Sequence, residues 1–136
     1  MRGSGRPLDA TADVTSRLNN CIRAKRKVVR IENSKFKLAL VKILKKMGCV
    51  TRVSVVARDG RAAELIVELK YVAGRPMVRE LKQLSRPGRR VYWTAQEAKF
   101  ASKTPAEAFI LSTNVGLLEA NESLRIGGEI VCKVKW

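Results

Sequence analysis

Histidine is absent from this chain of 136 residues, and aromatic residues make up only 5% of it. The lack of histidine removes the commonest general base of enzymes. The three cysteines, Cys21, Cys49 and Cys132, are widely spaced and form no CxxC pair. This pattern disfavours a zinc site and predicts buried thiols in a reducing compartment. No apolar run approaches the roughly 20 residues that span a bilayer, and aromatic anchors for a membrane surface are scarce, so no membrane partner is expected.

Acidic residues are also few, because 12 Asp and Glu oppose 28 Lys and Arg and leave a net charge of +16. Such an excess predicts a polyanionic partner, and nucleic acid is the usual one. Residues 1–50 carry 13 basic and 3 acidic groups, residues 51–100 carry 11 and 5, and residues 101–136 carry 4 and 4. Phosphate contacts supply affinity, whereas shape and hydrogen bonds supply selectivity. We therefore expect attraction from the first two thirds and readout from the neutral last third; the alternative is a generally basic protein without this division.

Apolar periodicity predicts two amphipathic helices in the first half of the chain. In the first, Val14 and Leu18 belong to one apolar stripe; in the second, Leu40 and Leu44 do. An Asp-Gly pair between two β-branched runs predicts a hairpin. The expected elements are a helix over residues 9–24 capped by Asp9 or Thr11, a strand over 28–31, a helix from a cap at Asn33 or Ser34 to Gly48, and strands over 50–56 and 63–71.

The second half reads as short strands with little helix. Thr94-x-x-Glu97 is a capping box for a helix that ends near residue 102, and the last residues alternate between apolar and polar. The expected strands cover residues 77–84, 91–93, 109–111 and 130–136, with a turn over 85–90 and a short helix over 119–125. We expect a flexible basic arm (1–8), an N-terminal α/β domain (9–71), a linker (72–76) and a C-terminal β-rich RNA-binding domain (77–136).

The last quarter holds the most specific motif. An apolar strand leads into Ser112-Thr-Asn-Val-Gly116, and Gly127-Gly-Glu129 precedes the final strand. Small polar side chains and bare backbone are suited to hydrogen bonding with a shaped RNA surface. The segment resembles the C-terminal signature of the bacterial-type small-subunit ribosomal protein S8 family. Other pieces resemble the same family in the same order: Asp9-Ala-Thr-Ala-Asp13 with Ser16, Arg17 and Asn20, Ser34-Lys-x-Lys37, Ile43-Leu-Lys-x-x-Gly48, Leu69-Lys-Tyr71 and Ser85-x-Pro-Gly-Arg-Arg-Val-Tyr92.

This resemblance implies an α+β fold, in which an N-terminal α/β domain of two helices and three strands precedes a C-terminal domain of mostly antiparallel strands with short helices. It implies a structural constituent of the small ribosomal subunit that binds the central domain of small-subunit ribosomal RNA directly and helps its assembly. The expected partners are that RNA and neighbouring small-subunit ribosomal proteins, with no cofactor, no metal and no small-molecule substrate.

The candidate RNA contacts fall into four groups. Ser112 and Thr113 offer hydroxyls to ribose 2′-OH groups or base edges, unless they cap a helix before Leu117. Glu129 either accepts hydrogen bonds from RNA, orients Ser112 and Thr113, or only solubilises the surface. Tyr92 either stacks on a base or ribose or packs within its strand. The complete set is Ser112, Thr113, Asn114 and Gly116; Gly128 and Glu129; Arg89, Arg90 and Tyr92; and Ser34, Lys35, Lys37 and Arg17 from the N-terminal domain.

The N-terminal candidates have a simpler reading. Ser34, Lys35 and Lys37 lie at a helix start, where free N–H groups attract phosphate, or they form a solvated cap and charged face. A lysine-rich face on the same helix is expected to supply general phosphate attraction and no readout: Lys35, Lys42, Lys45 and Lys46.

Two other functions compete with a ribosomal role. One is a free RNA-binding regulator of the same fold, and the other is an enzyme on nucleic acid. The enzyme is disfavoured, because the chain has no P-loop, no histidine and no carboxylate cluster at metal spacing. Departures from the bacterial form of the family favour a mitochondrial ribosome over a bacterial or plastid one: Val115 where a basic residue is common, a longer basic arm, and the ending Cys132-Lys-Val-Lys-Trp136. Asn114 in place of a serine is a further departure.

Overall fold

The computed structural model describes residues 7–122 and 126–136. The expected arm over residues 1–8 and the end of the expected helix over 119–125 therefore lie largely outside the described residues. The chain divides into two compact units, Met1–Arg79 and Glu80–Trp136, which we call the N-terminal unit and the C-terminal unit. The fold is α+β, with helices first and strands dominating the second unit, as the sequence predicts.

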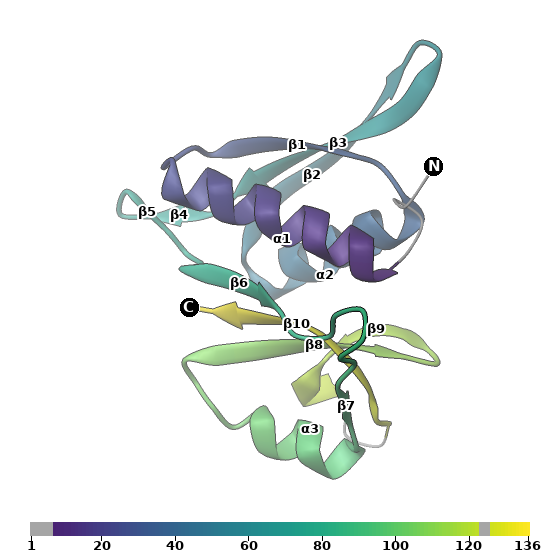
Figure 1. The fold of residues 1–136 in the computed structure, drawn as a ribbon. Helices are drawn as coiled ribbons and strands as arrows, with labels where there is room; N and C mark the ends of the chain where they lie inside the picture. Colours follow the sequence, from purple (N-terminus) through teal and green to yellow (C-terminus); the bar gives the residue numbers. More distant parts are fainter. Residues whose placement is uncertain (1–6, 123–125) are drawn as a thin grey trace. The chain divides into compact units, whose positions relative to one another are not determined.

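The N-terminal unit packs two helices on one face of a three-stranded antiparallel sheet (Figure 1). The strand order is β1-β3-β2, so β1 and β2 are the two edges. Its elements are α1 (Pro7–Arg23), β1 (Val28–Glu32), α2 (Lys35–Met47), β2 (Val50–Arg58), β3 (Arg61–Leu69), β4 (Tyr71–Val72) and β5 (Arg75–Pro76).

The buried residues explain this packing. Leu65, Val67 and Leu69 alternate along β3 and are buried, which identifies the face that the helices cover. The apolar stripes of both helices meet that face, and Leu18 and Leu44 have relative exposures of 0% and 1%. The predicted helical periodicity is thus confirmed. Because α1 begins at Pro7, the residues expected to cap it, Asp9 and Thr11, lie inside its first turns instead.

Turn and cap residues fix the ends of the elements. The Ser34 side chain accepts a hydrogen bond from the Lys37 backbone N–H at 3.2 Å, which makes Ser34 the N-cap of α2. Gly48 ends the same helix with φ of +94°, a left-handed conformation that glycine adopts readily. The predicted hairpin between β2 and β3 is confirmed, with Arg58 opposite Arg61.

A buried ion pair joins the two helices. Lys37 is 3% exposed, and its Nζ lies 2.7 Å from an Asp13 carboxylate oxygen. The other Asp13 oxygen accepts from Arg17 Nε at 2.9 Å. Burial by itself would raise the pKa of Asp13, but the hydrogen bonds from Lys37 and Arg17 outweigh it and lower that pKa. Lys37 therefore holds α2 against α1 and does not present its charge to solvent, contrary to our expectation.

Residues 72–76, expected to form a linker, build a tight hairpin instead. Val72 of β4 lies opposite Arg75 of β5. Between them Ala73 and Gly74 both have positive φ, 53° and 79°, as in a type I′ turn. This hairpin belongs to the N-terminal unit, and the boundary between the units follows Arg79.

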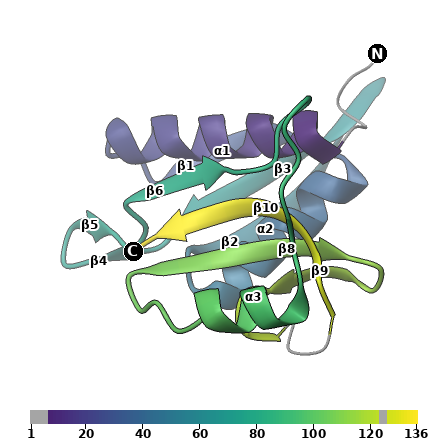
Figure 2. The same ribbon diagram turned by 60° about the horizontal axis from the view of Figure 1, so that its bottom comes forward.

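The C-terminal unit is an antiparallel sheet with one short helix (Figure 2). The strand order is β6-β10-β8-β9, and β7 also pairs with β10. β8 is longer than predicted, β9 was not predicted, and a single 3₁₀ turn stands where the helix over 119–125 was expected. The elements are β6 (Glu80–Gln83), β7 (Tyr92–Trp93), α3 (Ala95–Ala101), β8 (Glu107–Thr113), β9 (Gly116–Glu119), the 3₁₀ turn η2 (Ala120–Glu122) and β10 (Gly128–Lys135).

The core of this unit lies between the sheet and α3. Ala98, Leu111 and Ala120 are buried together, and Trp93 and Phe109 pack against them with ring centroids 4.9 Å apart. The predicted capping box of α3 is confirmed, because the Thr94 hydroxyl accepts from the Glu97 N–H and the Glu97 carboxylate accepts from the Thr94 N–H.

The expected alternation along β10 is broken. Ile130, Val131 and Cys132 are all buried, and the pairing with β8 shifts register between Ile130 and Cys132. A bulge of this kind turns an extra side chain inward. Burial raises the pKa of Cys132 to about 12, so this thiol stays protonated and serves as an apolar core residue. In the described part of the chain, no helix is long and apolar enough to cross a membrane.

The Asp13–Lys37 pair predicts an acid-dependent stability. Asp13, whose folded pKa is lowered, stabilises the fold above its unfolded pKa of about 3.9, and this stabilisation is lost as the pH falls through the folded value. Lys37→Met removes the buried charge but leaves Arg17 on Asp13, and we expect it to lower the free energy of unfolding at pH 7 by about 1–3 kcal/mol. Urea unfolding at pH 7 and pH 3 measures both effects.

The matched control is Lys42→Met, because Lys42 is exposed on the same helix. It should change the free energy of unfolding by less than about 0.5 kcal/mol. Equal stability of Lys37→Met and Lys42→Met at pH 7 would show that the buried pair contributes nothing to the fold.

Candidate nucleic-acid interface

Three strands bring sequence-predicted candidates into one row across the sheet of the C-terminal unit. Glu129 of β10 lies opposite Tyr92 of β7 on one side and opposite Ser112 of β8 on the other. Residues directly opposite in antiparallel strands share a face, with Cβ atoms roughly 5 Å apart. An aromatic ring, a carboxylate and a hydroxyl therefore stand side by side on this face. We call Tyr92, Glu129 and Ser112 the cross-strand row.

The glycines before Glu129 let the three strands approach. A Cβ on Gly127 would lie 2.5 Å from the Trp93 carbonyl oxygen, and one on Gly128 would collide with the Ser112 carbonyl oxygen. Both obstacles are backbone atoms, which cannot rotate away as side chains can. The Gly-Gly pair is thus a packing requirement of the row, and Gly128 has this structural role whether or not it also touches a ligand.

Glu129 has one unsatisfied oxygen. Its side chain is 17% exposed, and Oε2 lies 3.6 Å from Arg90 Nε, close enough for an ion pair but too far for a hydrogen bond. Oε2 is buried and, within the described residues, has no hydrogen-bond partner. The positive charge of Arg90 therefore balances the carboxylate, while Oε2 stays buried without a donor in the described part of the chain. A buried acceptor without a donor is costly, so a donor from a ligand would be stabilised there.

Arg90 and Tyr92 both lie next to this carboxylate. Hydrogen bonding with Tyr92 and the charge of Glu129 raise the pKa of Arg90, which keeps the guanidinium fully charged. Tyr92 is 62% exposed, so the alternative in which it packs within its strand is wrong. The exposed tyrosine can stack on a base while the neighbouring arginine binds a phosphate.

The turn before β7 is held by a residue that sequence reasoning missed. Ser85 is fully buried, and its hydroxyl both accepts from the Val91 N–H at 3.0 Å and is 3.2 Å from the Val91 carbonyl oxygen, to which it can donate. Arg86 and Arg89 close the turn through paired backbone hydrogen bonds. The arginines of the turn are consequently exposed on a fixed loop. A serine two residues before Pro-Gly was the available signal.

The Ser-Thr-Asn segment is a hairpin tip and not a helix cap. Thr113 pairs with Gly116, and β9 continues from there, so the capping alternative is wrong. The Thr113 hydroxyl donates to the Gly116 carbonyl oxygen at 2.8 Å and accepts from the Val115 N–H at 3.2 Å. Thr113 thus shapes the turn, and its proton is already used. Asn114 and Val115 form the exposed tip, and Gly116 has φ of +115°.

Ser112 differs from its neighbour. Its side chain is half-buried beside Glu129, and its hydroxyl has no hydrogen-bond partner among the residues that the structure describes. One alternative was that Glu129 orients Ser112 and Thr113. Within the described residues, no hydrogen bond joins the Glu129 side chain to either hydroxyl. Ser112 can therefore both donate to and accept from a ligand.

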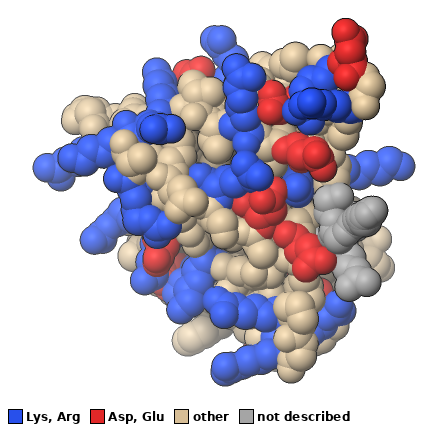
Figure 3. Space-filling model, turned by 45° about the horizontal axis from the view of Figure 1, so that its top comes forward, with Lys and Arg blue, Asp and Glu red and all other residues tan. Residues whose placement is uncertain are grey.

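The four remaining candidates all belong to the N-terminal unit. Ser34 is occupied as a helix cap, Lys37 is buried, and Arg17 is bound to Asp13. Lys35 is exposed with Lys42, Lys45 and Lys46 on α2, as predicted. On the face shown in Figure 3, Lys and Arg side chains predominate and Asp and Glu are interspersed among them.

The division of charge along the sequence does not coincide with the two units. The basic turn of Arg86, Arg89 and Arg90 comes from the middle third of the sequence, yet it lies in the same unit as the cross-strand row. Within residues 7–122 and 126–136, no group of three or more Cys, Asp and Glu side chains could hold a metal ion. The geometry is that of a surface for hydrogen bonding and stacking beside cations.

Comparison with known proteins places this chain in a family. The family model for ribosomal protein S8 matches residues 9–136. Proteins named small ribosomal subunit protein uS8 are similar along nearly their whole length. Those of Sulfurihydrogenibium sp. and Shewanella amazonensis are 36% and 38% identical, covering 93% of this chain and 97% and 96% of theirs. That of Chlamydia pneumoniae is 35% identical, covering 96% of this chain and 98% of its own.

The backbone approach at Gly128 predicts a strong effect of one methyl group. Gly128→Ala must push β10 from β8, and overpacking of this kind should cost about 1–3 kcal/mol of unfolding free energy. Val115→Ala at the exposed hairpin tip is the control, with a change below about 0.5 kcal/mol. Guanidinium unfolding measures both. If Gly128→Ala is as stable as the control, the strands do not need this glycine.

Proposed function

Because the chain belongs to the ribosomal protein S8 family, a family of small ribosomal subunit proteins and not of enzymes, we propose that it binds the central domain of small-subunit ribosomal RNA directly and helps its assembly. The cross-strand row carries this proposal. Tyr92, Glu129 and Ser112 offer a stacking surface, an acceptor and a hydroxyl on one face, and within the described residues neither the acceptor nor the hydroxyl has a hydrogen-bond partner. The resemblance of the C-terminal signature to the family supports the choice of RNA.

The chemistry of the row suits the minor groove of an RNA helix. That groove is wide and shallow, and it displays 2′-hydroxyl groups and base edges. Glu129 Oε2 has no donor within the described residues, so a 2′-hydroxyl or a base amino group can donate to it once the side chains that bury it move aside. Bringing a carboxylate near phosphates is unfavourable by itself, and Arg90 at 3.6 Å offsets that repulsion. Ser112 reads a second group on the same surface.

The two kinds of contact then have different tasks. The exposed Arg86, Arg89 and Arg90 of the turn bind phosphates beside the row and set its register on the RNA. Asn114 at the hairpin tip adds a side chain that both donates and accepts. The lysine face of α2 contributes attraction that does not depend on RNA sequence, and this part of the affinity should fall steeply with salt.

A free RNA-binding regulator of the same fold is the alternative. It would use the same row on another RNA and would not remain in a ribosomal particle. Sedimentation of a cell extract through sucrose in high salt separates the two functions, because an assembled subunit protein stays with the small subunit. Recovery of the protein only in the slowly sedimenting fractions would favour the regulator.

The compartment is part of the same proposal. Val115, Lys135 and the basic stretch before Asp9 depart from the bacterial form of the family, and these departures favour a mitochondrial ribosome. The relatives named above are bacterial and give this choice no support. Fractionation of the source cells with an antibody to the protein would decide it.

The row predicts a loss of selectivity without a loss of stability. Ser112→Ala removes one hydroxyl that has no partner among the described residues, and it should weaken binding to a cognate central-domain RNA fragment by roughly 0.5–1.5 kcal/mol. Binding to an unrelated RNA hairpin and the melting temperature should hardly change. Isothermal titration at fixed salt measures both affinities.

The control variant acts on charge instead of readout. Lys42→Glu with Lys45→Glu reverses two exposed charges on α2. It should weaken binding to both RNAs by the same factor and make both affinities less dependent on salt. If this double variant loses affinity only for the cognate RNA, or if Ser112→Ala lowers the affinity for both RNAs equally, the assignment of selectivity to the cross-strand row is wrong.

A further inference from the structure

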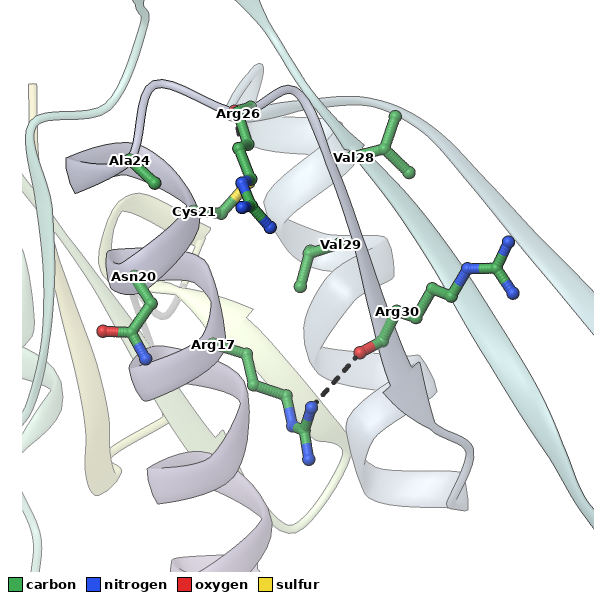
Figure 4. A pocket seen from close by; sticks show the side chains of 8 residues that line it. All are labelled: Arg17, Asn20, Cys21, Ala24, Arg26, Val28, Val29 and Arg30. Carbon is green, nitrogen blue, oxygen red and sulfur yellow. Dashed lines mark hydrogen bonds between the residues drawn. The ribbon is translucent and has the colours of Figure 1, made fainter.

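A groove of about 630 Å³ lies between the second half of α1 and β1 in the N-terminal unit (Figure 4). Its charged lining consists of Arg17, Arg26 and Arg30. Its apolar lining includes Val28 and Val29, of which Val28 is 48% exposed. The groove thus combines cations at its rim with aliphatic side chains, which distinguishes it from the uniformly charged lysine face of α2.

One wall of the groove is the open edge of a β-sheet. In the order β1-β3-β2, β1 has a neighbour on one side only. Leu69 N donates to the Lys27 carbonyl and Asn33 N donates to the Ala63 carbonyl, so the odd-numbered residues of β1 bond to β3. The N–H and C=O groups of Val28 and Arg30 consequently point away from the sheet.

Only a weak internal contact covers this edge within the described residues. Arg17 Nη1 donates to the Arg30 carbonyl oxygen at 3.5 Å, the upper limit of a hydrogen bond. The dashed line in Figure 4 shows that this guanidinium reaches across the groove from α1. The Arg30 carbonyl therefore accepts a hydrogen bond from a side chain. In a paired strand, the same carbonyl would accept from a backbone N–H of the neighbouring strand.

The basic end of the groove is held rigidly. The Arg26 carbonyl oxygen accepts from the Tyr71 hydroxyl at 2.5 Å and from the Cys21 thiol at 3.2 Å. Lys25 beside it has φ of +57°, a conformation that these contacts maintain. The Arg26 side chain is exposed and has no acidic partner in the part of the chain that the structure describes. These contacts fix the backbone that carries this cation at the end of the groove.

We propose that this groove is a docking site for an extended acidic segment of a partner protein, which pairs with β1 as an additional strand. The proposal goes beyond the RNA site and does not depend on it, since it concerns another unit and another class of partner. A polypeptide supplies backbone donors and acceptors in alternation, as the outward groups of Val28 and Arg30 require. Phosphates of RNA supply acceptors only, and they gain nothing from the aliphatic side chains of the groove.

Docking also explains the position of Arg17. A backbone N–H of the added strand takes over the Arg30 carbonyl oxygen and displaces Arg17 Nη1. The Arg17 Nε remains bonded to Asp13, but its freed Nη1 can then bind a carboxylate of the segment, and the exposed guanidinium of Arg26 can bind another in the two-pronged manner that suits arginine. Alternate side chains of the segment lie against Val28 and Val29, so the fitting sequence alternates acidic with apolar residues.

The probe is an end-blocked octapeptide that alternates Glu with Val, added to the full-length protein. We expect saturable binding by titration calorimetry, with slowed hydrogen exchange at the amides of Val28 and Arg30. A peptide of the same pattern with Lys in place of Glu should bind at least about tenfold more weakly, because it meets three arginines. Absence of saturation by the Glu-Val peptide at millimolar concentration overturns the proposal.

Val28→Pro tests the strand pairing directly. It removes an N–H that points outward, so the bonds between β1 and β3 remain, and edge strands tolerate proline. We expect Glu-Val binding to fall about tenfold, whereas Val28→Thr, which keeps the N–H and the branched shape, should bind within about twofold. Unchanged far-UV circular dichroism and unchanged binding of the cognate RNA fragment verify that Val28→Pro is folded. Equal peptide binding by both variants overturns strand addition.

Arg26→Gln tests the charge without touching β1, and Lys42→Gln on α2 is its matched control. Arg26→Gln should lower the affinity for the Glu-Val peptide several-fold, whereas Lys42→Gln should leave it unchanged. A single-stranded oligouridylate serves as the competing ligand. If it protects the Val28 and Arg30 amides and displaces the peptide, the groove is a phosphate surface and the proposal is wrong. Failure of RNA readout by Ser112→Ala would leave these peptide results unaffected, so the two ideas are tested separately.

Discussion

The close approach of three backbones at Gly127 and Gly128 is the constraint on which the C-terminal unit depends. A Cβ at either position would meet a carbonyl oxygen of a neighbouring strand. Only with both side chains absent can β10 pair with β7 and β8 at once, and only this pairing sets Glu129 between Tyr92 and Ser112. The chemical character of the surface, which combines an aromatic ring, a carboxylate and a hydroxyl, follows from a purely steric condition at the two residues just before Glu129.

Electrostatics enters at a different level. The net charge of +16 makes the molecule attractive to any polyanion, but it carries no selectivity. The local arrangement does: Arg90 lies near enough to compensate Glu129 and too far to satisfy Oε2. A carboxylate that is neutralised in charge and still lacks a donor can approach RNA and take a hydrogen bond from it. The net charge therefore provides attraction to polyanions, and the local geometry around Glu129 provides selectivity.

The N-terminal unit shows how buried and exposed cations differ in use. Lys37 is enclosed and fixes α2 to α1 through Asp13, whereas the lysines at positions 42, 45 and 46 of the same helix face solvent. Along α1, Arg17 is shared between Asp13 and the Arg30 carbonyl, and it reaches over the one open edge of β1. Cations of the same sequence region thus serve packing, general attraction and the covering of a sheet edge, according to where the backbone places them.

The sequence by itself determined both helices of the N-terminal unit, the Asp-Gly hairpin and the capping box at Thr94, because periodicity and turn chemistry are local. Tertiary structure decided the rest. Whether Lys37 faced RNA or Asp13 depended on a helix 24 residues away, although its spacing of three and seven residues from Leu40 and Leu44 placed it on the buried face. Residues 72–76 became a hairpin, and β9 formed from a segment with no strand signal of its own, because pairing with β8 supplied what propensity lacked. The meeting of Tyr92, Glu129 and Ser112 could not be predicted for the same reason: strand register is set by contacts between segments distant in sequence, and no local pattern encodes it.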